Sequence, residues 1–345
     1  MQNRAASCRQ RLPRVFIIVL NWNGWRDTIP CLDSLRSLAY PDCHVVVVDN
    51  GSLDDSVSRL QTWGTASSVP VAELRAEDAE AQELADRHPE TELHGANAVT
   101  DPWALTIIRC PENRGFAAGN NVGIAYALKQ GAEYVLLLNN DTIVDSEFLT
   151  HTVSVGESDD RIGIVGPKIY NLSGPDILQS VGGTMDLWTG RGRLLGAGER
   201  DHGQRDDVRD VDWVSGAAIM IKRVVLQSVG VLDERFFLTY EETDLCHRVK
   251  AQRFRITVAP QAKIWHKGGA STHQPTAEFY LTKNRALFMR KNATWYQTWV
   301  FLLFYTAGSL RRFLLRVWQR DRASALAIAR GFASGLRALL RWAKT

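Results

Sequence analysis

The sequence lacks the cysteine patterns of two protein classes. Its five cysteines are an odd number, and none of them stands in a Cys-x-x-Cys pair or at ligand spacing from a histidine. Disulfide-stabilised secreted domains and structural zinc sites carry such patterns. We therefore expect neither a disulfide framework nor a zinc site, and we expect the chain to work in a reducing cytosol.

Long apolar runs are also scarce. The basic N-terminus is followed by VFIIVL, residues 15–20, and six residues are too few for the core of a signal peptide. We expect residues 1–13 to form a disordered basic arm. The strongly apolar stretch WYQTWVFLLFYTAGSL, residues 295–310, has 16 residues, whereas about 20 are needed to span a bilayer. This stretch is expected to lie in a membrane interface or to pack on a partner.

Acidic residues are almost absent from the C-terminal part. Residues 281–345 contain 13 lysines and arginines and one acid, Asp321, so this part carries a charge of about +12 and the rest about −9. Such a tail usually meets phosphates, on nucleic acid or at an anionic membrane. We expect no nucleic acid, because the tail lacks interleaved base-stacking aromatics and polar base readers. We predict a peripheral position at the inner face of the cytoplasmic membrane. The alternative is a helical subdomain that covers the rest of the chain or a second subunit in a homo-oligomer.

Strand-like and helical patterns alternate in the first part of the chain. This alternation predicts an α/β fold with a doubly wound, mostly parallel sheet. The strand-like runs are VFIIVL (15–20), HVVVVDNGS (44–52), ALTIIRC (104–110) and YVLLLNN (134–140).

The remaining segments define the expected domain organisation. Residues 14–275 are expected to form one domain, in which the pattern becomes α+β after Asp141. Residues 62–103 are rich in Ala and Glu and poor in large apolar side chains, which predicts an exposed insertion, partly helical or disordered. A Gly-rich region at 180–203 is expected to be irregular. The helical pattern and the basic charge of residues 276–345 predict a basic helical extension.

Two motifs at strand ends indicate contacts with a nucleotide. In VVVVDNGS, Asp49 ends a strand beside a tight turn, where it can accept a hydrogen bond from uracil or thymine N3–H or from a ribose hydroxyl. In PENRGFAAGNNVG, Gly115, Gly119 and Gly123 at four-residue spacing allow a ligand to approach the backbone at a helix start. The alternatives are an ordinary turn at Asp49 and a helix that packs tightly on the sheet through its glycines.

The run YVLLLNND ends in a polar triplet. A strand of this composition is buried on both faces, and the carboxyl ends of such strands are where open α/β sheets bind ligands. Asn139 and Asp141 are two residues apart, so both side chains can face one point. Their oxygen atoms suit Mg²⁺ or Mn²⁺ bridging a diphosphate, which would supply the remaining oxygen ligands.

Further acids and a histidine follow downstream. YEETDLCHR places Glu241, Glu242 and Asp244 in a turn before a helix, and ITVAPQAKIWHKGG, a predicted last strand pair, places His266 at a strand end. Acids are common in the first turn of a helix, and a lone histidine is usually structural. Each of these motifs alone leaves that alternative open.

Taken together, the motifs resemble a known family. The order DNGS, NxGFAxGNNxG, LLLNND, ExxDLxxR and HxGG, with the opening NWNG, is similar to the family 2 glycosyltransferases with the GT-A fold, and most of all to their bacterial rhamnosyltransferase branch. The resemblance covers residues 14–290. It implies a GT-A fold with an α+β acceptor half and a C-terminal helical extension. It also implies inverting transfer of a sugar from a nucleoside diphosphate to an acceptor hydroxyl, with Mg²⁺ or Mn²⁺ as cofactor.

The resemblance assigns roles to single residues. Asp141 and His266 would bind the metal. Glu242 would occupy the second place of the family's Glu-Asp pair, whose aspartate is the usual general base, while Glu241 and Asp244 stay open as alternative bases. The expected donor-binding residues are Asn21, Asn23, Asp49, Asn113, Gly115, Asn120, Asn139 and Asn140.

Two positions depart from the family pattern. Asn139 replaces the first acid of the Asp-x-Asp metal motif, which weakens the expected metal affinity in the absence of donor. Glu242 stands where the family has Asp and adds one methylene to the base. Family branches with Asn-x-Asp are familiar, so neither change predicts an inactive protein.

The expected partners are a nucleotide sugar and a glycan. The resemblance favours dTDP-rhamnose as the donor, with UDP-sugars as the alternative, and a cell-envelope glycan or lipid-linked acceptor. The acceptor side is expected to include Trp213, Ser215 and Gly216 in VDWVSGAA, although Trp213 could equally be a core residue. The competing class is a non-catalytic protein of the same fold that binds a nucleotide sugar or a glycan. Such a protein would have lost the metal acid or every candidate base, and neither is lost here.

Overall fold

A computed structural model of the protein describes residues 11–81, 104–268 and 274–340. Its main strands are β1 (Val15–Asn21), β2 (Cys43–Asp49), β3 (Val71–Arg75), β4 (Leu105–Arg109), β5 (Tyr134–Asn139), β6 (Thr142–Val144), β7 (Ile162–Asn171), β8 (Gly174–Ser180), β11 (Arg209–Asp210), β12 (Ala218–Lys222) and β13 (Arg255–His266). Within the described residues they form one sheet, in the order β11-β13-β7-β12-β5-β1-β2-β4-β3, with β6 beside β13 and β8 beside β7. A second sheet is the hairpin of β9 (Gly183–Asp186) and β10 (Arg191–Leu194).

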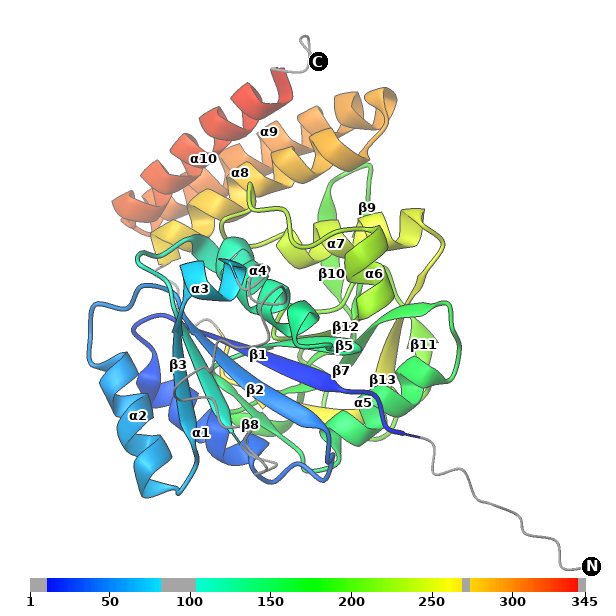
Figure 1. Cartoon of the computed structure of the whole chain (residues 1–345). Coiled ribbons are helices and arrows are strands. Elements are labelled where there is room, and N and C mark those ends of the chain that lie inside the picture. Colours follow the sequence, from blue (N-terminus) through cyan, green and yellow to red (C-terminus); the bar gives the residue numbers. More distant parts are fainter. Residues whose placement is uncertain (1–10, 82–103, 269–273, 341–345) are drawn as a thin grey trace, which may run out of the picture.

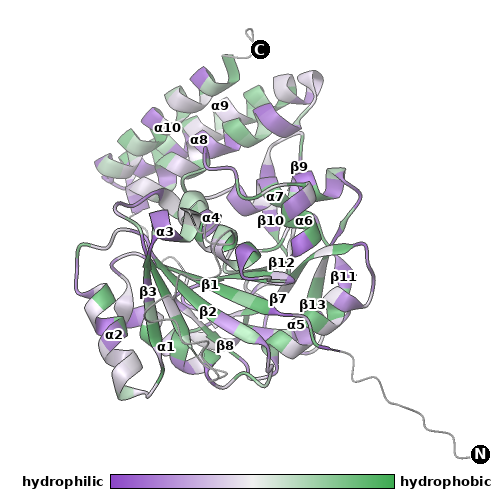
Figure 2. Ribbon diagram, viewed as in Figure 1, coloured by the Kyte–Doolittle hydropathy of each residue, from purple (hydrophilic) through white to green (hydrophobic). Residues whose placement is uncertain are grey.

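The first part of the sheet is parallel, as the alternating pattern predicts. β1 lies between β2 and β5 and runs parallel to both, and β4 and β3 continue the parallel order beyond β2. The register pairs Asn21 with Asp49 and Leu20 with Asn139, so the polar residues that end these strands meet at one edge. Figure 2 shows that the central strands are largely hydrophobic, which agrees with burial on both faces.

The second part of the sheet joins β5 in the opposite direction. β12 pairs antiparallel with β5, and its first residue, Ala218, faces Leu138 near the end of β5. The N–H of Asn139 donates to the carbonyl of Ala217 at 2.9 Å. The segment that leads into β12 therefore reaches the same edge as the ends of the parallel strands.

Helices cover both faces of the sheet (Figure 1). They are α1 (Trp25–Leu35), α2 (Ser56–Ala66), α3 (Ala76–Ala81), α4 (Gly115–Lys129), α5 (Phe148–Glu157), α6 (Arg223–Ser228), α7 (Glu241–Ala251), α8 (Gln274–Asn292), α9 (Trp295–Trp318) and α10 (Arg322–Leu340). Alternate residues of β1 face opposite sides, as a strand requires. One side shares a core with α1, α2 and α5, and the other packs against α4, α6 and α7.

Helix α4 lies very close to the sheet. A Cβ atom added to Gly119 would come within 2.7 Å of the Leu20 side chain, and one added to Gly123 within 2.5 Å of Ile18. These distances are below normal contact, so two of the three spaced glycines serve packing. The structure thus favours the packing interpretation for Gly119 and Gly123.

The three C-terminal helices form a layer over the hairpin and α7 (Figure 1), and the predicted helical extension is confirmed. Phe301 and Tyr305 of α9 are fully buried with Phe288 of α8 and with Phe236 and Tyr240 of the segment before α7. One face of the tail therefore shares a core with the segment before α7.

The opposite face of α9 has no described partner. Its exposed apolar side chains are Trp295, Trp299, Leu303, Phe304, Leu310, Leu314, Leu315, Val317 and Trp318.

Among the described residues, α10 is the one helix long and apolar enough to cross a membrane. It packs closely on α8, because a Cβ on Gly331 would lie 2.6 Å from the Phe279 carbonyl. The extension therefore covers the rest of the chain with one face and leaves an apolar surface on the other.

The prediction that residues 62–103 form an insertion was wrong in its first part, because Val71–Arg75 form the edge strand β3 parallel to β4. The predicted partly helical character holds there, since residues 62–66 complete α2 and Ala76–Ala81 form α3. The β3 side chains are partly or fully exposed, so the strand lacks the apolar run that marks a buried strand. Residues 82–103, like residues 1–10 of the predicted arm, lie outside the described residues.

Three smaller predictions need correction. The Gly-rich region 180–203 is not irregular, because it contains the β9–β10 hairpin. The predicted last strand pair is one long strand, β13, with a register irregularity between Ala259 and Lys263. Glu241, Glu242 and Asp244 do not precede a helix, because they form the first turn of α7.

We predict that Gly123→Val destabilises the protein, because the added methyl groups would overlap Ile18 and Val48. Overpacking of this kind costs about 1–3 kcal/mol in the free energy of unfolding. Ala125→Val, on a partly exposed position of the same helix, is the matched control and should change stability by about 0.5 kcal/mol or less. Urea denaturation of both variants measures the difference, and equal losses would contradict the close packing of α4.

Candidate active site

Polar residues gather where β1 and β2 end. Asn21 is fully buried, and its amide donates to Asp49 Oδ1 at 2.8 Å. Ser52 Oγ donates to the same oxygen at 2.6 Å, and Thr28 Oγ1 donates to Asn21 Oδ1 at 2.8 Å. These bonds fix the Asp49 carboxylate beside the turn and leave Oδ2 with a single backbone donor, the N–H of Ser52 at 3.2 Å.

A cleft of about 520 Å³ opens at this edge of the sheet. We call it the strand-end cleft. Its walls come from the ends of β1 and β5, the turn after β2, the start of α4, the loop before α7 and the start of α8. The lining residues are Leu20, Trp22, Asn23, Gly24, Asp27, Asn50, Asn113, Gly115, Phe116, Asn139, Asn140, Phe237, Leu238 and Thr276.

Five of the eight predicted donor-binding residues line the strand-end cleft: Asn23, Asn113, Gly115, Asn139 and Asn140. The other three lie behind its wall. Asn21 and Asp49 are buried in the bonds described above, and Asn120 is buried inside α4 with its amide donating to the Phe116 carbonyl at 2.9 Å.

The wall near α4 is built around Asn50. Its amide group donates to Asn113 Oδ1 and to the Gly115 carbonyl, both at 3.1 Å. Gly115 has a positive φ of 82°, and a Cβ there would meet Phe237 at 2.5 Å. A side chain at this position is therefore excluded by both backbone and space.

The predicted metal residues converge on His266. Its Nε2 lies 3.1 Å from Asp141 Oδ1 and 3.2 Å from Asn139 Nδ2. On its other side, Nδ1 lies 2.6 Å from Gln179 Oε1, and the Gln179 amide donates to Asn171 Oδ1 at 3.3 Å. The carboxyl end of β5 and the end of β13 thus supply two candidate ligands at one point, and β8 supplies the group that orients the histidine.

This arrangement defines the protonation of the neutral imidazole. Gln179 accepts a hydrogen bond, so the proton is on His266 Nδ1, and Nε2 carries the lone pair that accepts from Asn139. Asp141 Oδ1 is buried and has no hydrogen-bond donor. A nitrogen lone pair and a carboxylate oxygen that face each other at 3.1 Å repel unless a proton or a cation lies between them.

The pair fits a divalent cation that completes its shell elsewhere. Nitrogen and carboxylate oxygen are ligands of Mn²⁺, and carboxylate oxygen is a ligand of Mg²⁺. Within the described residues, no group of three or more histidines, cysteines and acids gathers to hold a metal. A metal at Asp141 and His266 would therefore depend on oxygen atoms of the substrate.

The three candidate bases at the start of α7 occupy different surroundings. Asp244 is fully buried, and its oxygens pair with Arg248 at 2.9 Å and with Lys291 at 2.7 Å. Both oxygens of Asp244 are therefore engaged by cations. Glu241 and Glu242 have no such partners within the described chain, and each has one buried oxygen without a hydrogen bond.

Burial raises the pKa of both glutamates, and the charge of Glu242 raises the pKa of Glu241 further. The two glutamates differ in their exposure to solvent. Glu241 is buried, whereas Glu242 is partly exposed and lies beside Gly216, where an added Cβ would be 3.7 Å from Glu242 Cγ. Glu242 is thus the acid of the three that has no cationic partner and belongs to a partly exposed residue.

The loop before α7 is strained and held in place by α8. Thr239 and Tyr240 have positive φ angles of 68° and 74°, which side chains with a Cβ rarely adopt. The Asn284 amide donates to the carbonyls of Leu238 and Thr239 at 2.8 and 2.9 Å. The C-terminal extension therefore fixes the backbone that presents Glu242.

The predicted acceptor segment lies beside the Glu242 side chain. Gly216 faces that glutamate, and Ser215 Oγ accepts from the Ala217 N–H at 3.3 Å. Trp213 supports the hairpin: its Nε1 donates to the Thr184 carbonyl at 3.2 Å, and its ring occupies the space a Cβ on Gly183 would take. The packing alternative for Trp213 is thus the one the geometry favours.

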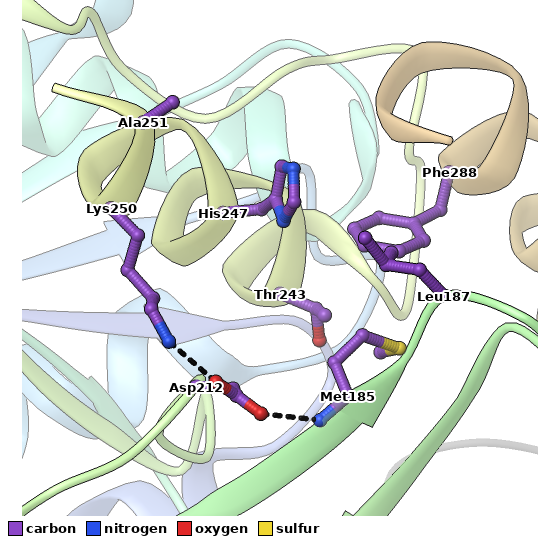
Figure 3. Close-up of a pocket in the computed structure, with 8 residues that line it drawn as sticks. All are labelled: Met185, Leu187, Asp212, Thr243, His247, Lys250, Ala251 and Phe288. Atoms are coloured by element: carbon purple, nitrogen blue, oxygen red, sulfur yellow. Dashed lines mark hydrogen bonds and ion pairs between the residues drawn. The ribbon is translucent and has the colours of Figure 1, made fainter. Parts of the chain in front are cut away.

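A second hollow of about 320 Å³ lies on the hairpin side of α7 (Figure 3). Thr243, His247 and Lys250 reach it from α7, with Met185 and Leu187 opposite. Phe288 and Ala251 line it as well, and Lys250 pairs with Asp212. Thr243 Oγ1 donates to Glu242 Oε1 at 3.4 Å, so the wall of this hollow contacts the candidate base.

Sequence reasoning missed several residues of the site. Gln179 comes from a region with no motif, and its role depends on β8 lying beside β7. Phe237 and Thr276 line the strand-end cleft from positions 98 and 137 residues after Asn139, the last of the strand ends. No local signal marks these positions. Trp22 belongs to the NWNG motif, and Asp27 follows that motif by three residues, so both positions had a local signal.

Curated relatives share part of this sequence. The low-salt glycan biosynthesis hexosyltransferase Agl10 of Haloferax volcanii is 30% identical over 42% of this chain and 46% of its own length. The dTDP-rhamnosyl transferase RfbF of Shigella flexneri is 25% identical over 56% of this chain and 66% of its own. The N-acetylglucosaminyl-diphospho-decaprenol L-rhamnosyltransferase of Mycobacterium tuberculosis is 27% identical over 24% of this chain and 26% of its own. The chain thus spans less than two thirds of the length of these relatives.

Solved structures share the fold. The mannosyltransferase PcManGT from Pyrobaculum calidifontis, in complex with GDP-Man and Mn²⁺, superposes with a TM-score of 0.50 at 15% identity, over 97% of this chain and 89% of its own. Residues 1–349 of S. aureus TarS in complex with UDP-GlcNAc give 0.53 at 15% identity, over 94% and 81%. These neighbours confirm the predicted GT-A architecture.

The family model described as glycosyltransferase like family 2 matches residues 13–286, which include every strand and helix that forms the site up to most of α8. The chain belongs to glycosyltransferase family 2.

Proposed function

We propose that the protein is a metal-dependent, inverting glycosyltransferase that moves a sugar from a nucleoside diphosphate to an acceptor hydroxyl. The observation that carries the proposal is the pairing of Asp141 Oδ1 with His266 Nε2 at 3.1 Å, at the end of β5 and beside the strand-end cleft. Glu242, a carboxylate with no cationic partner among the described residues, stands across Gly216 from this end of the strand.

The strand-end cleft would bind the donor. Asp49 would accept from the base, with Asn21 and Ser52 holding its carboxylate in place. Asn23, Asn113, Asn139 and Asn140 would line the path of the ribose and diphosphate, and Asn120 would support the wall from inside α4. Neutral amides can both donate and accept, so they suit sugar hydroxyls and phosphate oxygens alike.

The divalent cation, when bound, would neutralise the departing diphosphate as a Lewis acid. This chain would hold it with Asp141 and His266, and Gln179 would keep the histidine lone pair pointing toward it. Mg²⁺ and Mn²⁺ both suit the ligand set, and the Mn²⁺ in the PcManGT complex supports a metal of this kind.

Glu242 would act as the base. Its carboxylate takes the proton of the acceptor hydroxyl while the hydroxyl oxygen attacks the anomeric carbon and the bond from that carbon to the diphosphate breaks. One displacement from the opposite face inverts the anomeric centre. A retaining reaction through a covalent intermediate would need a second carboxylate under the sugar.

The substrates are proposed from the named relatives. The dTDP-rhamnosyl and decaprenol-linked rhamnosyl transferases support L-rhamnose from dTDP-rhamnose and a lipid-linked, cell-envelope glycan as acceptor. UDP-sugars stay as the alternative, because Asp49 would accept from N3–H of thymine and uracil equally. A panel of dTDP- and UDP-linked sugars, scored by nucleotide release and product formation, tests this choice.

The location would be the inner face of the cytoplasmic membrane. The exposed face of α9 presents tryptophans and leucines, and the C-terminal part carries an excess of arginine. Tryptophan prefers the membrane interface, and arginine attracts anionic headgroups. Residues 14–275 would be the catalytic domain, and the three helices after them would hold it at the surface.

We predict that Asp141→Ala lowers the transfer rate by about 100-fold or more, and that Gln179→Ala weakens the apparent affinity for Mn²⁺ by about 10- to 100-fold. Asp176→Ala removes an exposed carboxylate of β8 and should leave both quantities unchanged. Nucleotide release is measured against Mn²⁺ concentration, with circular dichroism to confirm folding. Near-normal transfer in the presence of chelator would overturn the metal assignment.

We predict that Glu242→Gln loses about 100-fold or more in turnover with donor affinity preserved, because only the proton acceptor is removed. Burial raises the pKa of Glu242, so the rate of the wild type should fall on acidification at a pH above the ordinary glutamate value of 4.5. Glu241→Gln is the matched control and should retain most of the rate. If Glu241→Gln or Asp244→Asn is the variant that loses turnover, the base is misassigned.

We predict that the full chain binds anionic liposomes at low salt and that Trp299→Glu weakens this binding several-fold, since it places a charge on the exposed face of α9. Ser58→Glu, on the exposed side of α2, adds the same charge elsewhere and should have no effect. Truncation near Lys291 is a poor test, because Phe301 and Tyr305 complete a core. Failure of the full chain to sediment with liposomes would assign the exposed face of α9 to another partner.

A further inference from the structure

Two arginines converge on a glycine of α9. The Arg191 Nη2 atom of β10 lies 3.7 Å from the position that a Cβ on Gly308 would take, and the Arg285 Nη1 atom of α8 lies 4.0 Å from the same position. Three separate elements therefore bring two guanidinium groups to one point. We call Arg191 and Arg285 the Gly308 arginine pair.

The Gly308 arginine pair lacks a carboxylate partner among the described residues. The side chain of Arg191 forms no hydrogen bond or ion pair with them. Arg285 donates to the Thr189 carbonyl and stacks at 5.5 Å from the Phe301 ring centre. Arg285 Nε is buried without a partner, and burial lowers the pKa of this side chain. Asp186, the acid in electrostatic range, is engaged by Trp188 N and Thr189 Oγ1.

The neighbouring arginines differ from the pair in having acid partners. Arg312 and Arg316 of α9 both pair with Glu278, and Arg316 also lies 3.9 Å from Asp321 Oδ2. Arg191 and Arg285 have no acid partner among the described residues, and guanidinium groups in that state suit a bound anion.

The pair is connected through the hairpin to the residue that precedes α7. The Tyr240 hydroxyl donates at 3.0 Å to the carbonyl of Gly190, the residue before Arg191, and the Thr189 carbonyl accepts from Arg285. Tyr240 is followed directly by Glu241 and Glu242. The tip of the hairpin thus connects the start of α7 with both arginines.

We propose that the Gly308 arginine pair binds the phosphate or diphosphate through which the acceptor glycan is attached to its carrier. This inference rests on the proposed function, because it names a binding site for the acceptor of that reaction. When the accepting sugar is linked directly to a diphosphate, that diphosphate lies one sugar ring away from the hydroxyl at Glu242. Guanidinium groups recognise phosphate oxygens through paired N–H donors.

The glycine itself supports a site. A glycine inside a helix costs about 1 kcal/mol relative to alanine. No backbone clash accounts for it, since a Cβ at position 308 would make ordinary contacts of 3.7 and 4.0 Å with the two arginines. The missing side chain leaves a space the size of a methyl group between the guanidinium groups, which one oxygen atom of an anion can enter.

Three variants test the proposal in the full-length protein. Gly308→Ala fills the room between the arginines and leaves every charge in place, and it should preserve or raise the melting temperature. Arg191→Gln removes one donor from an exposed position. Arg311→Gln is the matched control, because it removes the same charge from an exposed position of α9 beside Arg312.

The first readout is binding of a C15 prenyl diphosphate in neutral detergent, compared with the C15 prenyl alcohol, by isothermal calorimetry. We expect Gly308→Ala and Arg191→Gln each to weaken diphosphate binding by about tenfold, with Arg311→Gln unchanged. Anionic vesicle binding of the same proteins separates the two phosphate sources. Equal loss of vesicle binding in Arg191→Gln and Arg311→Gln, with diphosphate affinity unchanged, would assign the arginines to lipid headgroups and overturn the proposal.

The second readout separates this inference from the proposed function. Donor hydrolysis in the absence of acceptor should be the same in all variants, and KM for a diphosphate-linked acceptor should rise about tenfold in Gly308→Ala and Arg191→Gln with kcat preserved. Unchanged KM in both variants overturns the acceptor site while leaving the transferase intact. Absence of donor hydrolysis and transfer in the wild type would instead refute the proposed function.

Discussion

The arrangement of the candidate site depends on how β5 pairs with its two neighbouring strands, β1 and β12. Parallel pairing with β1 brings the carboxyl ends of β1, β2 and β5 to one edge, and antiparallel pairing with β12 brings the opposite end of that strand to the same place. Because of this mixed pairing, the residues that would bind a nucleotide and the segment that would face the acceptor meet at the last residues of one buried strand. A fully parallel sheet would carry the segment before β12 to the far side of the molecule.

The sequence was informative where burial and chemistry coincide. The apolar run of β5 predicted a central strand, and the acid after it was placed correctly at the strand end, with His266 at the end of β13 beside it. The edge strand β3 escaped prediction, because its side chains are partly or fully exposed and carry no apolar run. This segment becomes a strand because it pairs with the edge of β4 that β2 leaves open.

Long-range contacts account for the rest of what could not be predicted. Gln179 orients His266 from a strand whose sequence has no feature of a ligand. Asp244 looked like one of three equivalent acids, and its separation from Glu242 depends on Lys291, which lies on a helix that begins thirty residues later. The residue pattern of one segment carries no information about which side chain of a distant segment will contact it.

The strained loop before α7 has a consequence for engineering. Thr239 and Tyr240 occupy a backbone region that glycine and asparagine adopt more easily, so substitution there is an obvious way to gain thermal stability. The same two residues lead directly into the first turn of α7, which carries Glu242, and Asn284 holds this backbone from α8. A substitution that relaxes the loop would release the start of α7 as well. Laboratory evolution that selects for heat resistance alone would therefore move the proposed base through residues that do not line the strand-end cleft.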